Sequence, residues 1–210
     1  KCAGNSMTSA LCPNHLEVHQ RQRAEGRSYV PLKWSNSRDF YIIVPGWKVG
    51  QFQNTHPEVF KNSWKYAFVR NPYDRVVSSY SYSLEKKWIG KGTIIGQQTF
   101  EEFVDNLMIK WPTSDQRDPL YAIYEHSYPL TKHLSDKDGK YDYLDSIFRV
   151  ENLQEDFNKV CSKIGIPSIK LGHENKTDHK FYREYYKNDK TIEKVSKYFK
   201  EDIDHFGYKF

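Results

Sequence analysis

Short apolar runs and helically spaced apolar positions alternate along this chain. Runs rich in β-branched and aromatic residues predict buried strands at 40–44, 66–70 and 146–150. Apolar residues at helical spacing predict helices at 6–24, interrupted near Pro13, and after residues 71, 99, 152 and 191. Strands that alternate with helices predict an α/β fold with a parallel sheet and helices on both of its faces.

Local signals set several of the expected boundaries. Thr99 and Glu102 form a capping box at the start of one helix. The last predicted helix has its apolar stripe at Ile192, Val195, Phe199, Ile203 and Phe206, and Gly207 ends it. Three prolines make residues 110–145 irregular, so this stretch is expected to hold a substrate loop and a short helix.

Residues 65–80, KYAFVRNPYDRVVSSY, carry the most information. They predict a strand that stops at Arg70 and turns at once into a helix, with Asn71 as N-cap and Pro72 at the first helical position. Asp74 suits the positive end of the helix dipole, and Val76, Val77, Tyr80 and Leu84 make the apolar stripe. Such a turn directs backbone N–H groups at an anion, on which Arg70 and Ser78 can converge.

This run resembles the 3′-phosphate-binding element of the sulfotransferases that use 3′-phosphoadenosine 5′-phosphosulfate (PAPS), above all the carbohydrate branch. The resemblance implies that Arg70 and Ser78 bind the 3′-phosphate, and that the product 3′-phosphoadenosine 5′-phosphate (PAP) binds there too. An N-cap beside an incidental surface arginine is the alternative.

The first six residues, KCAGNS, precede apolar positions at helical spacing. A lysine, two small residues and a hydroxyl at a helix start can cradle a phosphate. The hexapeptide is not the GxxxxGK[ST] loop of nucleoside triphosphatases, but it resembles the sulfotransferase 5′-phosphosulfate loop. The resemblance implies that this loop binds the donor and that Lys1 is catalytic; the donor-binding candidates are Lys1, Ala3, Gly4, Asn5 and Ser6, of which Asn5 departs mildly from the family pattern. Because the family's loop follows a core strand, we expect that strand upstream of Lys1.

Two further blocks extend the resemblance over nearly the whole chain. Residues 149–153, RVENL, are similar to a strand-to-helix turn of the family, and residues 173–177, HENKT, with the ending DHFGY, are similar to its C-terminal pattern. The resemblance therefore implies one sulfotransferase domain over 1–210, with a P-loop-like parallel sheet. Lys176 and Thr177 are candidates to close over the nucleotide, and a solvated turn is the alternative.

Sulfuryl transfer requires an in-line donor, neutralised charge on the leaving phosphate and a group that takes the hydroxyl proton. The resemblance implies no metal and assigns Lys1 to the bridging oxygen. The base stays open between His126, His56, a carboxylate such as Glu125, and no dedicated base. The aromatic side chains that could stack on a sugar, for which core or loop packing is the alternative, are Trp47, Trp88, Trp111 and Tyr128.

Composition narrows the class of protein. The 210 residues suit one domain, and no apolar run approaches the ~20 residues of a membrane span. A net charge of +5 suits an anionic ligand without requiring nucleic acid. Cys2, Cys12 and Cys161 form neither a disulfide framework nor a metal-site spacing. An odd number of cysteines favours a reducing compartment, so we expect the protein in the cytoplasm. The Golgi lumen is the alternative if a membrane anchor precedes the sequence.

The resulting hypothesis is a PAPS-dependent sulfotransferase that acts on a hydroxyl, expected to be that of a glycan. The alternatives are a kinase-like nucleotide transferase, a nucleic-acid-binding module, and a non-catalytic binder of anionic polysaccharide. The sequence leaves the acceptor and the oligomeric state open.

Overall fold

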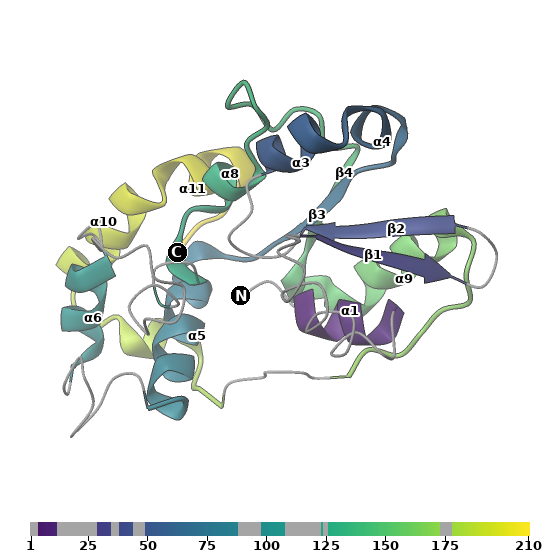
Figure 1. Cartoon of the computed structure of the whole chain (residues 1–210). Coiled ribbons are helices and arrows are strands. Elements are labelled where there is room, and N and C mark those ends of the chain that lie inside the picture. The colour runs from purple at the N-terminus through teal and green to yellow at the C-terminus, as the bar shows by residue number, and fades with distance from the viewer. Residues whose placement is uncertain are drawn as a thin grey trace. The chain divides into compact units, whose positions relative to one another are not determined.

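The computed structural model describes residues 4–11, 29–34, 38–43, 49–87, 98–107, 123, 126–172 and 178–210 (Figure 1). The chain divides into two compact units, and each is described by itself. We call Cys2–Val69 with Lys132–Asn175 the sheet unit, and Arg70–Thr131 with Lys176–Phe210 the helical unit.

The sheet unit contains a parallel pair of strands, β3 (Tyr66–Val69) and β4 (Ser146–Arg149). The register runs from Tyr66 opposite Ser146 to Val69 opposite Arg149. The predicted parallel pairing is confirmed for these two strands, each of which ends one residue earlier than expected. The 3₁₀ turn η1 (Val150–Asn152) follows β4 directly.

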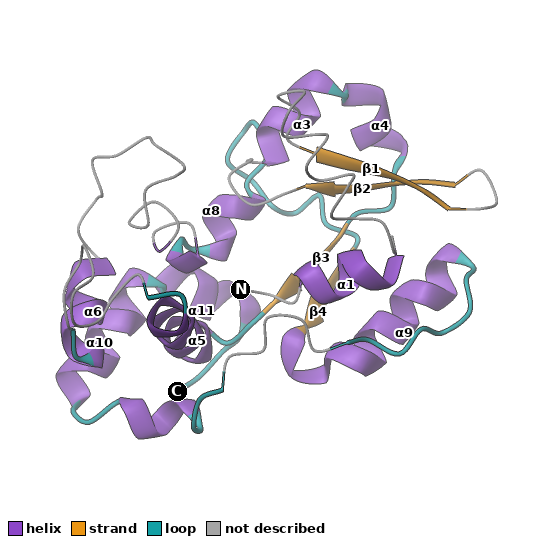
Figure 2. Ribbon diagram, turned by 60° about the horizontal axis from the view of Figure 1, so that its bottom comes forward, coloured by secondary structure: helices purple, strands orange, loops and turns teal. Residues whose placement is uncertain are grey.

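Two helices pack on these strands (Figure 2). They are α1 (Gly4–Leu11) and α9 (Leu153–Ile164), the second of which ends at Gly165 in the left-handed conformation, with φ 72°. Their shared apolar cluster includes Leu11, Phe68, Phe157 and Val160, which are all buried. The amphipathic pattern predicted α9 correctly, and the helix expected at 6–24 is described only as far as Leu11.

A second sheet corrects the expectation that all strands join one parallel sheet. Strands β1 (Tyr29–Trp34) and β2 (Arg38–Ile43) pair antiparallel, from Tyr29 opposite Ile43 to Trp34 opposite Arg38, and form their own two-stranded sheet. β2 corresponds to the strand predicted at 40–44. β1 was missed because it contains Pro31, which lacks the N–H of a central strand but is tolerated in an edge strand.

Short helices complete the sheet unit. α3 (Val49–Thr55) and α4 (Pro57–Asn62) share a small core of Val49, Phe52 and Phe60, against which Tyr143 packs. The helix α8 (Leu130–Leu134) is the short helix expected within residues 110–145; its first two residues belong to the helical unit and the rest to the sheet unit.

The helical unit is built around α5 (Pro72–Glu85). The helix α6 (Phe100–Leu107) begins at the predicted capping box: the Glu102 N–H donates to Thr99 Oγ1 at 3.2 Å, and the Thr99 N–H donates to Glu102 Oε2 at 2.7 Å. The 3₁₀ turn η2 (Tyr182–Tyr185) also packs here. Val76 and Val77 are buried as expected, whereas Leu84 is 42% exposed, so the apolar stripe of α5 stops before it.

The single C-terminal helix predicted from the apolar stripe is wrong. Two helices, α10 (Asp189–Tyr198) and α11 (Lys200–Phe206), meet at Phe199, whose φ of −102° and ψ of 23° leave the helical range. The apolar stripe nevertheless keeps facing the core across the break, since Val195 and Phe199 are both buried. Gly207 ends α11 as predicted, in the left-handed conformation with φ 67°.

Candidate functional site

The turn between β3 and α5 has the predicted caps. Asn71 Oδ1 accepts a hydrogen bond from the Tyr73 N–H at 3.0 Å, and Pro72 occupies the first helical position. This satisfies one of the N–H groups that a helix start leaves without an intrahelical partner. The helix start thus has its predicted cap, and its partial positive charge favours an anion nearby.

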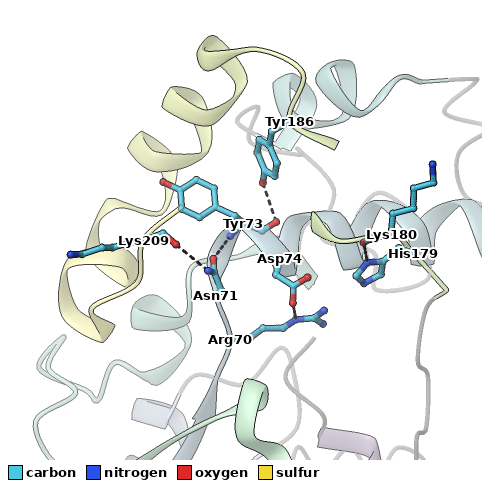
Figure 3. A network of polar contacts seen from close by, with 8 residues as sticks. All are labelled: Arg70, Asn71, Tyr73, Asp74, His179, Lys180, Tyr186 and Lys209. Atoms are coloured by element: carbon cyan, nitrogen blue, oxygen red, sulfur yellow. Dashed lines mark hydrogen bonds and ion pairs between the residues drawn. The ribbon is translucent and has the colours of Figure 1, made fainter. Parts of the chain in front are cut away.

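Arg70 is held along the first turn of α5 (Figure 3). Its Nε donates to Asp74 Oδ2 at 2.7 Å, and the two side chains are 15% and 24% exposed. Asp74 and Ser78 are four residues apart and so share one face of the helix. The ion pair thereby brings Arg70 to the face of α5 on which Ser78 lies, and Ser78 is buried. The predicted pairing of guanidinium and hydroxyl is consistent with this arrangement.

The turn is also tied to the C-terminal residues of the helical unit. Asn71 Nδ2 donates to the Lys209 carbonyl at 3.2 Å, and Tyr186 Oη donates to the Tyr73 carbonyl at 3.0 Å (Figure 3). Burial, and then proximity to Tyr73, raises the pKa of the Tyr186 phenol, which keeps it a neutral donor. The sequence predicts Asn71 only as an N-cap, and it does not predict the hydrogen bonds that join this turn to Lys209 and Tyr186.

The predicted phosphosulfate loop leads into α1. The helix begins at Gly4, two residues before the expected start at residue 6, and Ser6 is its third residue, which is only 4% exposed. The described part of this loop belongs to the sheet unit, whereas Arg70 and Ser78 belong to the helical unit. Lys1 and Ala3 lie outside the described residues, and Gly4 and Asn5 are described by their backbone alone.

The two candidate histidines have different surroundings. His126 lies in the helical unit, where its ring meets the Tyr82 ring edge to face, with 5.4 Å between centroids. Tyr82 is one helical turn beyond Ser78 on α5. His56 lies in the sheet unit, stacked on Phe52 at 4.9 Å, with its Nδ1 2.8 Å from Thr55 Oγ1. Within the helical unit, the structure thus places His126 beside the helix that carries Ser78.

Several other candidates fall outside the described residues: Glu125, Lys176, Thr177, Trp47, Trp88 and Trp111. Tyr128, the remaining candidate for sugar stacking, is half-buried, and its carbonyl accepts from Arg75 Nη2 at 2.7 Å. Its backbone is therefore anchored on α5.

The turn after β4, within the RVENL block, is held by Asp156. This carboxylate accepts from the Arg149 N–H at 2.9 Å and from Lys159 Nζ at 2.6 Å. Burial by itself would raise the pKa of Asp156, but the two hydrogen bonds outweigh it and hold that pKa below its usual value. Asp156 was not predicted, although a carboxylate in the first turn of α9 was a signal for such a cap.

The described ranges contain neither a metal-binding cluster nor a membrane-spanning helix. No cluster of three or more His, Cys, Asp or Glu side chains there is arranged to hold a metal ion. Likewise, no helix in this part of the chain combines the length and apolarity needed to cross a bilayer.

Comparison with known proteins gives one match. The model of the sulfotransferase family matches residues 1–209, which is nearly the whole chain. No curated protein and no solved structure matches it. The match supports sulfuryl transfer in general, and the mixed helices and small parallel sheet fit the α/β class expected.

Proposed function

We propose that this chain, which belongs to the sulfotransferase family and is a sulfotransferase, takes its sulfuryl group from PAPS and delivers it to a hydroxyl group of a carbohydrate. The observation that carries the donor assignment is the ion pair between Arg70 and Asp74, which holds a guanidinium along the face of α5 that bears Ser78.

On the donor side, Arg70 and Ser78 would recognise the 3′-phosphate. A guanidinium carries five N–H donors in a planar fork, and in Arg70 the ion pair to Asp74 is made through Nε. Such a fork and the Ser78 hydroxyl match the oxygens of a phosphate, and the start of α5 adds a favourable dipole and N–H groups. A 3′-phosphate distinguishes PAPS from adenylyl donors that lack it.

The start of α1 would bind the phosphosulfate end. Ser6 offers a hydroxyl in the first turn of this helix, and Lys1, three residues before Gly4, offers an ammonium. Lys1 would stabilise the negative charge that develops on the bridging oxygen as the bond to sulfur breaks. The resemblance to the family implies that the donor reacts without a metal ion.

His126 would take the proton. A bond forms between the acceptor oxygen and sulfur, while the bond between sulfur and the bridging oxygen breaks and PAP leaves. The hydroxyl proton passes to the imidazole, which is the side chain suited to this transfer near neutral pH. His126 is favoured over His56 because it contacts Tyr82 on the helix that carries Ser78.

A carbohydrate acceptor is supported by the run 65–80, which is most similar to the carbohydrate branch of the family. A kinase-like activity has less support, because the chain lacks a GxxxxGK[ST] loop. A nucleic-acid-binding module has the net charge of +5 and the 16 tyrosines in its favour, but the sequence contains no recognised nucleic-acid-binding motif.

Two measurements test the proposal. Calorimetry with PAP, AMP, ATP and a short oligonucleotide should show PAP binding much more tightly than AMP. Incubation with PAPS and a panel of glycans should release PAP in proportion to sulfated product. Equal affinity for PAP and AMP would exclude the donor assignment, and transfer only to non-carbohydrate hydroxyls would exclude the acceptor class.

A further inference from the structure

A buried charge lies on α5 beside the proposed phosphate-binding face. Arg75 is only 1% exposed, and its Nη2 lies 3.7 Å from Asp202 Oδ2 on α11. The same Nη2 donates to the Tyr128 carbonyl at 2.7 Å, and the guanidinium carbon stands 5.1 Å from the centroid of the Phe199 ring. Arg75 thus connects α5, α11 and the segment around Tyr128, all within the helical unit.

Asp202 continues the connection. Its Oδ2 accepts from the Leu130 N–H at 2.7 Å, and its Oδ1 accepts from the Thr131 N–H at 2.8 Å and from Thr131 Oγ1 at 2.7 Å. Asp202 and Thr131 are both fully buried. One carboxylate therefore fixes the backbone of two successive residues at the start of α8.

A third contact holds the beginning of the same segment. Ser79 Oγ and Ser127 Oγ share a hydrogen bond at 3.0 Å, and both side chains are buried. His126 directly precedes Ser127 and meets the Tyr82 ring, also on α5. We call residues 126–131 the clamped segment. Four of its six residues are held in this way: Ser127 by Ser79, Tyr128 by Arg75, and Leu130 and Thr131 by Asp202.

This arrangement is poorly explained by stability alone. A buried ion pair contributes little more to stability than well-packed apolar side chains of the same volume. Within the described residues Arg75 Nε also has no hydrogen-bond partner, which costs free energy in a buried site. Hydrogen bonds to backbone groups do, however, fix the orientation of those groups directly, in addition to what apolar packing fixes.

We propose that Arg75, Ser79 and Asp202 are positioning residues that hold the clamped segment so that His126 faces the acceptor hydroxyl. The inference rests on the proposed function, in which His126 is the base. Asp74 and Ser78 lie on one face of α5. Arg75 directly follows Asp74 and Ser79 directly follows Ser78, so the two positioning residues lie on the adjacent face of the same helix. A single rigid helix thereby sets the spacing between the grip on the 3′-phosphate and the base.

The test uses mild substitutions, because removing either charge of the buried pair risks unfolding the protein. Ser79→Ala removes the bond to Ser127, and Thr131→Val removes the hydroxyl bond to Asp202 with little change of volume. Ser83→Ala and Thr191→Val are the matched controls. Both control side chains are buried. The Ser83 hydroxyl donates to the backbone carbonyl of Ser79, which Ser79→Ala retains, so Ser83→Ala tests the loss of a buried hydroxyl from the same helix. The Thr191 hydroxyl donates to Asn188 Oδ1, outside the clamped segment.

The expected result is a fall in kcat of about tenfold for Ser79→Ala and Thr131→Val, which is less than the ~10²-fold that a 1 Å misplacement can cost. PAP affinity should stay within about twofold, because the phosphate grip is intact. In a His126→Ala background the same substitutions should cause no further loss, since a positioning effect is lost with the group that is positioned. The controls should leave kcat unchanged.

Three outcomes would overturn the inference. They are an equal loss in the control variants, a loss that persists in the His126→Ala background, and full activity of His126→Ala itself. The last would leave PAP binding and sulfuryl transfer standing, so it separates this inference from the proposed function. Absence of PAP binding by the parent protein would instead remove the proposed function on which the inference depends.

Discussion

Arg70 Nε donates to Asp74 Oδ2 at 2.7 Å, across the first turn of the helix that this arginine precedes. The pair orients the guanidinium before any ligand arrives, so less side-chain freedom remains to be lost on binding. A phosphate at the start of α5 would therefore meet an arginine already directed along the helix.

Replacing Arg70 should weaken PAP binding selectively. Charge-assisted hydrogen bonds contribute about 1.5–3 kcal/mol each, so Arg70→Ala should lower PAP affinity at least tenfold in calorimetry and leave AMP affinity nearly unchanged. Arg183→Ala is the control, because it removes the same charge from an exposed position of the same unit. An equal loss for both nucleotides would contradict a role specific to the 3′-phosphate.

Lys1→Ala should separate catalysis from binding. If Lys1 acts mainly on the charge that develops in the transition state, turnover should fall roughly 10²-fold or more while PAP affinity hardly changes. Steady-state kinetics and calorimetry on the same preparation measure the two quantities. Lys61→Ala, an exposed lysine of α4, is the comparison. An active Lys1→Ala enzyme would mean that the loop at 1–6 has been misinterpreted.

The two histidine variants should differ in activity. His126→Ala should lose about 10²–10⁴-fold in rate, the usual contribution of a general base, and the acidic limb of its pH–rate profile should disappear. His56→Ala should lose little, because the His56 ring is stacked on Phe52 and its Nδ1 lies 2.8 Å from Thr55 Oγ1, contacts typical of a structural histidine. A larger rate loss in His56→Ala than in His126→Ala would identify His56 as the base. If neither variant lost activity, a carboxylate such as Glu125 would become the leading candidate.

Asn71 should affect stability through both ends of its amide. Asn71→Ala removes the cap on Tyr73 N–H and the tie to the Lys209 carbonyl, and should lower the free energy of unfolding by about 1–2 kcal/mol in urea titrations. Asn71→Asp keeps an acceptor for the cap but loses the Nδ2 donor, so it should recover most of the loss. If Asn71→Asp is as unstable as Asn71→Ala, the tie to Lys209 outweighs the cap.

Asp156 should make stability depend on acidic pH. Its pKa in the folded protein lies below the unfolded value of about 3.9. The stabilisation is therefore fully present above about pH 4 and is lost as the pH falls through the folded-state pKa. Urea unfolding at pH 6 and pH 3 should show a larger loss for the parent protein than for Asp156→Asn. Glu155→Gln, at an exposed neighbouring position, should behave like the parent.

The sequence by itself determined the elements whose causes lie within a few residues. The Asn71 cap, the Thr99–Glu102 box and the stop at Gly207 each depend on a side chain and a backbone group close together in the chain, so residue type and spacing suffice to predict them. The same is true of the apolar spacing in α9. The apolar spacing after the first six residues likewise predicted a helix, although α1 begins at Gly4, two residues before the expected start at residue 6.

Only the tertiary structure decided the contacts between distant residues. The hairpin partner of β2, the break at Phe199 and the bonds from Asp202 to Thr131, 71 positions away, depend on which segments pack together. In the sequence, Asp202 is visible as a charged residue between the apolar positions of a helical stripe. The sequence does not indicate which cation or N–H group this carboxylate contacts. Periodicity tells which face of an element is buried; the partner on that face is selected by packing and hydrogen-bond geometry over the whole fold.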